Sequence, residues 1–93
     1  MGRLLVSTAR FRRAYSRLQT AEQALVDHTL QQLGAYFETG HAPVGLGMKK
    51  LGVGIFEVRA GLALRIVYVQ EGQTVVLALL GDHDEVRRFL KRQ

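Results

Sequence analysis

Four polar residues follow the most apolar run of the chain, and their types are those that carry acid–base or metal chemistry. The run is Thr74–Leu80 (TVVLALL), which has the length and composition of a buried strand. One glycine later come Asp82, His83, Asp84 and Glu85. A histidine among carboxylates has three interpretations: a proton-transfer site, a metal site, or the polar start of a helix.

The carboxylates have a sufficient structural role at the start of a C-terminal helix. Asp82 followed three residues later by Glu85 is the spacing of a capping box, in which each side chain bonds to the backbone N–H of the other residue. Asp84 adds negative charge at the positive end of the helix dipole. Apolar residues then recur at helical spacing, at Val86, Phe89 and Leu90. We therefore interpret the three carboxylates as helix-starting residues.

A metal site is not predicted. His28 and His41 fall in a predicted helix and a predicted loop, with no spacing that would complete a ligand set around His83. The chain has no cysteine, which excludes disulfides and thiolate zinc sites. We expect neither a metal nor another cofactor.

His83 remains as a candidate for proton transfer near neutral pH, because it lies just past the end of the apolar strand. A three-residue loop, Ala60–Leu62, between the two preceding strands would place Arg59 and Arg65 on one face of the sheet. In that register Arg59 lies two strand spacings, about 10 Å, from Leu80. We therefore expect the histidine and both arginines to meet at one end of the sheet, where arginines can hold a phosphate. The alternative is an exposed histidine at the start of a helix.

The N-terminal part of the chain predicts a short strand and a helical hairpin. Arg3–Ser7 (RLLVS) has the pattern of a strand, and Ser7 or Thr8 can cap the helix that follows. Thr20 and Gln23 have the capping-box spacing for a second helix. The apolar residues of that second helix repeat at helical spacing, as Val26, Leu30, Leu33 and Phe37.

After a loop over Glu38–Gly47, the apolar period changes from 3.6 to 2, which predicts an antiparallel sheet. Its predicted strands are Met48–Leu51, Ile55–Arg59, Leu62–Gln70 and Thr74–Leu80.

The turn between the last two strands sets which residues share a face. A two-residue turn at Glu71 and Gly72 would pair Gln70 with Gln73. This register places Leu79 on the core face and Leu80 on the opposite face. The opposite face is also largely apolar, so the C-terminal helix or a partner chain must cover it.

The length and charge of the chain limit the classes of function that it can have. Ninety-three residues make one domain, spanning 1–93, and the net charge of +5 is concentrated near the two ends of the chain. Such charge suits a polyanionic partner, with solubility as the alternative. No signal peptide and no run of about 18 apolar residues is present, so we expect a cytoplasmic protein without a membrane partner.

The ordered set of motifs resembles one known family. "IFEVRAG", "LRIVYV", "EGQTVVLALLG" and "GDHDEVRRFL" follow a strand and a helical pair, as in the RelE/ParE superfamily of toxins from bacterial type II toxin–antitoxin systems. The resemblance covers nearly the whole chain. It implies an α+β, microbial-RNase-like fold: a twisted antiparallel sheet, an N-terminal helical hairpin on one face and a short C-terminal helix.

The resemblance also implies an activity and partners. RelE-type members cut messenger RNA on the ribosome without a metal, by attack of the ribose 2′-hydroxyl on the adjacent phosphate. The expected protein is thus an mRNA interferase that inhibits translation. Its expected partners are a cognate antitoxin and mRNA on the ribosome, as a homodimer or as a heterotetramer with the antitoxin.

Individual positions follow from the resemblance. The catalytic positions fall on Lys50, Arg59, Arg65 and His83. The RNA-binding positions fall on Lys49, Lys50, Arg87 and Phe89. The arginines would hold the scissile phosphate, the lysines would bind RNA and help to deprotonate the hydroxyl, and the histidine would protonate the leaving oxygen. The tyrosine that several members carry in the last helix is missing, and Phe89 is the nearest aromatic residue.

Two other functions stay open at the level of sequence. The ParE branch of the superfamily has the same fold and inhibits DNA gyrase without a nuclease site. An inactive interaction module of the same fold is the other alternative.

Overall fold

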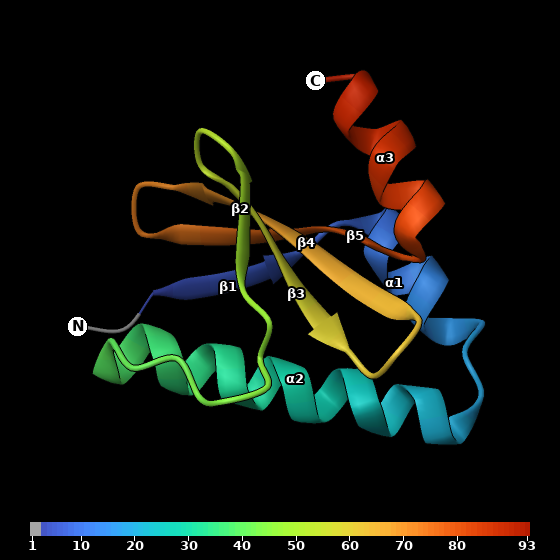
Figure 1. Ribbon diagram of the computed structural model, residues 1–93, viewed down its shortest axis with the longest axis horizontal. Coiled ribbons are helices and arrows are strands. Elements are labelled where there is room, and N and C mark those ends of the chain that lie inside the picture. Colours follow the sequence, from blue (N-terminus) through green and yellow to red (C-terminus); the bar gives the residue numbers. More distant parts are fainter. Residues whose placement is uncertain (1–2) are drawn as a thin grey trace.

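Five strands and three helices make up the fold, in the order β1, α1, α2, β2, β3, β4, β5, α3 (Figure 1). The computed structural model describes residues 3–93. The helices are α1 (Ala9–Ser16), α2 (Thr20–Thr39) and α3 (His83–Lys91). The strands are β1 (Leu4–Ser7), β2 (Lys49–Gly52), β3 (Ile55–Ala60), β4 (Leu64–Glu71) and β5 (Thr74–Gly81). Over the described residues, no helix combines the length and apolar character needed to cross a membrane.

The strands form one sheet in the order β1-β5-β4-β3-β2. Neighbours from β2 to β5 are antiparallel, as predicted, whereas β1 pairs with β5 in parallel, so the sheet is mixed. A parallel pair needs a long connection instead of a hairpin, and two helices and three strands separate β1 from β5 along the chain. The predicted α+β class is confirmed.

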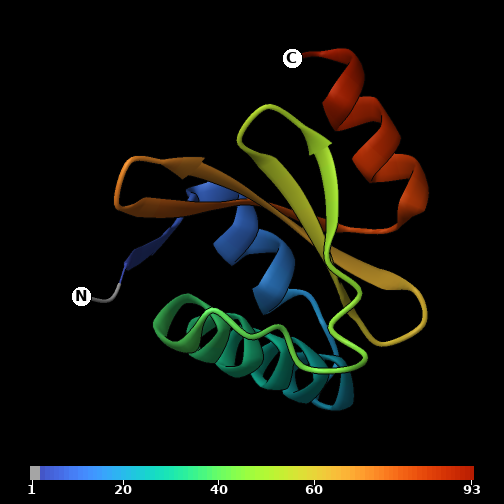
Figure 2. The same ribbon diagram turned by 60° about the vertical axis from the view of Figure 1, so that its left-hand side comes forward.

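The sheet has helices on both faces (Figure 2). On one face, α1 and α2 bury the main core, which includes Phe11, Val26, Leu33, Ile66 and Leu77. On the other face, α3 covers a smaller cluster of Val67, Leu79 and Val86, with Phe89 and Leu90 packed against it. The sequence left two alternatives for the cover of the second apolar face, the C-terminal helix or a partner chain, and the C-terminal helix packs there.

The starts of α1 and α2 show how local chemistry sets a helix boundary. Thr8 caps α1, because its hydroxyl accepts a hydrogen bond from the N–H of Phe11 at 3.1 Å. The capping box of α2 uses Gln19 and Glu22, one residue before the predicted pair, and the Glu22 carboxylate accepts from the Gln19 N–H at 3.1 Å. A carboxylate is a stronger acceptor than an amide and also suits the helix dipole, which favours this box.

The end of α2 depends on glycine. Gly40 has φ +78°, a left-handed conformation, and its N–H donates to the carbonyl of Tyr36 at 2.7 Å. The helix thus extends to Thr39, slightly past the predicted start of the loop at Glu38.

The β4–β5 turn differs from the prediction by one residue. Gly72 and Gln73 form the turn, with Glu71 paired to Thr74 and Gln70 to Val75. Gly72 has φ +59° at the first central position of the turn, a conformation that glycine adopts readily and that the predicted turn would have required of Glu71.

A β-bulge then exchanges the predicted faces of Leu79 and Leu80. Tyr68 pairs with Leu77 and Val67 pairs with Leu79, so Ala78 is an extra residue of β5 without a partner on β4. As a result Leu80 joins the main core and Leu79 joins the cluster under α3, the reverse of the prediction. One extra residue in one strand reverses the facing of all residues beyond it.

The β3–β4 hairpin has the odd loop length that the sequence predicted. The loop is Gly61–Ala63, shifted by one residue from the predicted Ala60–Leu62, with Ala60 paired to Leu64. Because the length stays odd, Arg59 and Arg65 share a face as expected.

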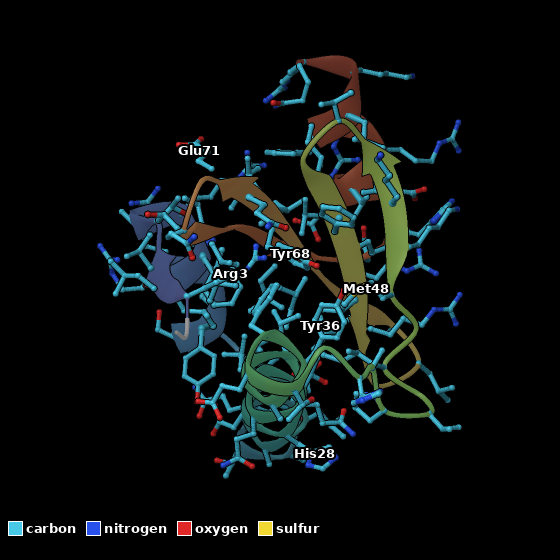
Figure 3. All side chains as sticks on the ribbon, turned by 90° about the vertical axis from the view of Figure 1, so that its left-hand side faces the viewer. Arg3, His28, Tyr36, Met48, Tyr68 and Glu71 are labelled. Carbon is cyan, nitrogen blue, oxygen red and sulfur yellow. The ribbon has the colours of Figure 1, made fainter. Side chains whose placement is uncertain are left out.

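Tyr68 is the central aromatic residue of the main core. It is 1% exposed, stacks on Phe56 at 5.2 Å between ring centroids and meets Phe37 edge-on at 5.6 Å. Its hydroxyl donates to Sδ of Met48 at 3.7 Å. Figure 3 shows Tyr68, Tyr36 and Met48 gathered between the sheet and α2. Burial raises the pKa of Tyr68 to about 12, with a further contribution from Tyr36.

This pKa predicts a loss of stability at alkaline pH. The folded state disfavours ionised Tyr68, so its contribution is fully present below about pH 10, the ordinary tyrosine pKa. The contribution is lost as the pH rises from about 10 to about 12. Thermal unfolding measured between pH 9 and 12 should therefore show a steeper loss for the wild type than for Tyr68→Phe. Parallel pH profiles for the two proteins would contradict the assignment.

Candidate active site

Most of the residues singled out in the sequence line one pocket. It has a volume of ≈ 270 Å³ and lies on the second face of the sheet, between β2, β3, β4 and α3. Its apolar wall includes Val86 and Leu90 of α3. Its polar lining consists of Lys49, Glu57, Arg59, Arg65, His83 and Arg87.

The two strand arginines are direct neighbours. Arg59 of β3 pairs with Arg65 of β4, and Arg65 pairs in turn with Gly81 at the end of β5. The predicted loop, Ala60–Leu62, would pair Arg59 with Ala63, so the observed loop brings the two arginines closer together. Like charges directly opposite on antiparallel strands are destabilising, which makes this pair unusual unless an anion or a carboxylate compensates it.

The backbone of Arg59 is fixed from two sides. Its N–H donates to the carbonyl of Leu46 at 3.1 Å, and its carbonyl accepts from the hydroxyl of Thr29 at 3.0 Å. Leu46 and Thr29 are both buried, so the long loop and α2 hold β3 in place at the pocket. Sequence analysis did not identify either contact, because both join segments that are distant along the chain.

His83 is positioned by the capping box that the sequence predicted. The Asp82 carboxylate accepts from the Glu85 N–H at 2.9 Å, and the Glu85 carboxylate accepts from the Asp82 N–H at 3.1 Å. Gly81 permits this close turn, because a Cβ there would lie 2.8 Å from Glu85 Cδ. The first residue of α3 is therefore the histidine, close to the start of β4, where Arg65 pairs with Gly81.

Arg65 and His83 are in contact. Nη1 of Arg65 lies 2.6 Å from Nδ1 of His83. A guanidinium group can only donate, so Nδ1 is the acceptor and carries no proton in this arrangement. The ring proton is then on Nε2, which can donate a hydrogen bond to a bound molecule.

Glu57 is the acidic member of the pocket. Its Oε1 lies 3.8 Å from Nε of Arg65, and the residue is 7% exposed. The sequence Glu57-Val58-Arg59 could have identified Glu57 as a pocket residue, because side chains two positions apart lie on the same face of a strand.

The two adjacent lysines lie on opposite faces. Lys49 pairs with Glu57 and lines the pocket, whereas Lys50 pairs with Phe56, whose side chain packs against the main core. The structure thus places Lys49, and not Lys50, with the other charged residues. A strand of alternating faces cannot direct both neighbours into one site.

The two candidate RNA contacts of α3 also separate. Arg87 lines the pocket and is exposed. Phe89 is half-buried and packs against the cluster of Val67, Leu79 and Val86, away from the pocket lining. Its ring therefore supports the attachment of α3 to the sheet.

The arrangement can bind an oxyanion and donate a proton. Four cationic side chains and one carboxylate face a common space, which leaves the pocket positive. Paired arginines match the oxygens of a phosphate group, and the imidazole beside them can supply a proton to a leaving oxygen.

Comparison with solved structures identifies the fold. A chain of the Escherichia coli DinJ–YafQ toxin–antitoxin complex matches with a TM-score of 0.74 at 10% identity, over 92% of this chain and 98% of that one. The YoeB/ParE toxin from Agrobacterium tumefaciens matches with a TM-score of 0.64 at 22% identity, over 86% and 98%. A chain of the RelBE2 toxin–antitoxin complex from Mycobacterium tuberculosis matches with a TM-score of 0.63 at 20% identity, over 89% and 100%.

At the level of sequence, no protein-family model and no curated protein matches this chain. The chain has the fold of the RelE/ParE-type toxins, and the resemblance stated from the sequence motifs is confirmed in this respect. The chain also spans nearly the full length of those toxins.

The capping box at the pocket yields a stability prediction. Asp82→Ala removes the acceptor for the Glu85 N–H and should lower the free energy of unfolding by about 1 kcal/mol. For a domain of this size the thermal midpoint should fall by roughly 4–8 °C. Asp84→Ala is the matched control, because Asp84 is exposed in the same turn, and it should change the free energy of unfolding by less than about 0.5 kcal/mol. Equal losses in both variants would contradict the box.

The facing of the two lysines predicts different effects on anion binding. Sulfate added to ¹⁵N-labelled protein should shift the backbone amides of Arg59, Arg65 and His83, because the oxyanion would bind among these side chains. Lys49→Ala should weaken the sulfate affinity severalfold, and Lys50→Ala should leave it unchanged. A loss of the same size in both variants would mean that only the overall charge matters.

Proposed function

We propose that this chain is the toxin of a type II toxin–antitoxin pair and that it cleaves messenger RNA on the ribosome without a metal. The observation that carries the proposal is the pocket in which two arginines and a histidine lie side by side on this fold. The solved structures of similar fold include a YoeB/ParE toxin and chains of toxin–antitoxin complexes. A toxin of this kind would act in the cytoplasm, where ribosomes are.

The proposed reaction is an internal phosphoryl transfer. The ribose 2′-oxygen attacks the adjacent phosphorus, the bond from phosphorus to the 5′-oxygen breaks, and the products are a 2′,3′-cyclic phosphate and a 5′-hydroxyl. Arg59 and Arg65 hold the non-bridging oxygens as negative charge grows on them. His83, as the doubly protonated imidazolium, gives its Nε2 proton to the leaving 5′-oxygen and becomes the neutral imidazole.

The proton of the attacking hydroxyl needs an acceptor. Lys49 in its uncharged form is the candidate in this pocket, since Lys50 faces the other way. In its charged ammonium form Lys49 would bind the RNA backbone, which is the other role that the resemblance implies for these lysines. The resemblance gave the catalytic position to Lys50 and an RNA-binding role to both lysines, whereas the facing of β2 favours Lys49 as the proton acceptor.

The antitoxin partner is proposed on the basis of the second sheet face. Beyond α3, the edge strand β1 leaves Leu4 63% and Val6 37% exposed. In the β1–β5 register these residues pair with Thr74 and Val76, on the face that α3 covers only in part. An antitoxin segment that covered this strip would bury apolar surface that a single chain leaves in water.

Expression in a bacterium tests the activity. Induction of the wild-type chain should arrest growth and produce new 5′ ends inside reading frames, as mapped on total messenger RNA. His83→Ala should reduce these cuts by roughly two orders of magnitude or more, because the leaving oxygen loses its proton donor. His28→Ala is the matched control, since His28 is exposed on α2 (Figure 3) and is not among the residues that line the pocket.

Other outcomes would identify other functions. Growth arrest without cuts in messenger RNA would favour inhibition of DNA gyrase, the activity of the ParE branch. Absence of arrest with a folded, stably expressed chain would favour an interaction module without catalytic activity.

A further inference from the structure

Glu57 is the one carboxylate buried within the described residues, and it lies at the centre of the positive pocket. It occupies the middle of β3, between Lys49 on β2 and Val67 on β4. A buried carboxylate loses its hydration, so it must be stabilised by a cation or by hydrogen bonds. The cations of the pocket supply that stabilisation.

The nearest of these cations is Arg65, which also contacts His83. Glu57 Oε1 lies 3.8 Å from Nε of Arg65, and Nη1 of the same guanidinium lies 2.6 Å from the imidazole. Nε itself is buried and has no hydrogen-bond partner within the described residues. A carboxylate about 1 Å closer would form that hydrogen bond. The three side chains therefore form one row: carboxylate, guanidinium, imidazole.

The planar guanidinium makes this row directional. Its five N–H groups point outward in one plane with fixed angles. If the carboxylate holds the Nε side, the plane can no longer turn about the side chain, and the Nη groups keep their direction toward the imidazole and the pocket. Precise placement of groups that contact a reacting phosphate is worth much of the rate of such a reaction.

We propose that Glu57 is a positioning residue: its carboxylate orients the Arg65 guanidinium, which in turn fixes the orientation of His83. The catalytic consequence rests on the proposed function, whereas the contact between Glu57 and Arg65 does not. The carboxylate also removes one unit of positive charge from the pocket. Glu57 thus weakens the attraction for the RNA backbone while it improves the geometry for cleavage.

The opposite effects on binding and on turnover distinguish this role from a purely structural one. In Glu57→Gln the pocket gains one unit of net positive charge, so affinity for a 2′-O-methyl RNA oligonucleotide, which lacks the nucleophile, should rise about threefold at low salt. The cleavage rate at saturating protein, on messenger RNA bound to the ribosome, should fall on the order of tenfold or more. A variant that was merely destabilised would lose both RNA affinity and cleavage rate.

Two further variants serve as controls. Glu57→Asp keeps the charge but withdraws the carboxylate by one methylene, so it should lower the cleavage rate without raising the affinity for RNA. Glu71→Gln makes the same change of charge at the β4–β5 turn, at the other end of β4 from Arg65 (Figure 3). It should alter neither the cleavage rate nor the affinity by more than about twofold.

A measurement without RNA tests the contact itself. In ¹⁵N-labelled protein, the Nε–H signal of Arg65, assigned through its loss in Arg65→Lys, should exchange slowly with solvent. Exchange should become on the order of tenfold faster in Glu57→Gln while the backbone amide spectrum stays that of the folded protein. Unchanged exchange would overturn the proposal.

The outcomes also separate this proposal from the proposed function. If the wild type does not cleave RNA but the exchange of the Arg65 Nε–H depends on Glu57, the nuclease function fails and the orienting contact stands. If the wild type cleaves RNA and Glu57→Gln cleaves at an equal rate, the nuclease function stands and the positioning role fails.

Discussion

The direct pairing of Arg59 with Arg65 is the constraint on which the candidate site depends. Two cations opposite each other on adjacent strands repel, so the fold must contain groups that offset the repulsion. The buried Glu57 carboxylate is one such group, and the His83 imidazole accepts a hydrogen bond from the second arginine on its other side. The compensation is incomplete, because Lys49 and Arg87 add further positive charge. A pocket that stays positive after its own carboxylate is counted is suited to an anionic ligand.

The position of α3 makes this pocket possible. The bulge at Ala78 directs Leu79 toward α3 and Leu80 toward the main core, so both faces of β5 are anchored close to the point where the chain leaves the sheet. The capping box then begins the helix at once, with His83 as its first residue. The apolar contacts of Val86, Phe89 and Leu90 hold the helix on the second face. The six residues from Gly81 to Val86 therefore contain both the capping box that starts α3 and the histidine of the pocket.

The site is simpler than the one implied by the sequence resemblance. It has no tyrosine in the last helix, and Phe89, the nearest aromatic residue, is used to attach that helix to the sheet. Only one of the two lysines faces the charged cluster. What remains is a set of cationic side chains with one imidazole and one carboxylate, on a fold that solved toxin structures share at 10–22% identity.

Local sequence patterns were sufficient to predict the helices and strands and most of the charged residues that line the pocket. The period of apolar residues predicted the helices and strands, and the spacing of Asp82 and Glu85 predicted the start of α3. The odd length of the β3–β4 loop predicted that Arg59 and Arg65 share a face. All three are local properties of neighbouring residues. The parallel pairing of β1 and the faces on which Leu79 and Leu80 lie became known from the tertiary structure alone. The same holds for the position of Lys49 in the pocket and for the contacts of Glu57 and Thr29. These depend on a single extra residue in β5, on the register between strands, and on segments brought together from distant parts of the chain. No local pattern encodes such contacts, since their free energy arises from the packing of the whole sheet.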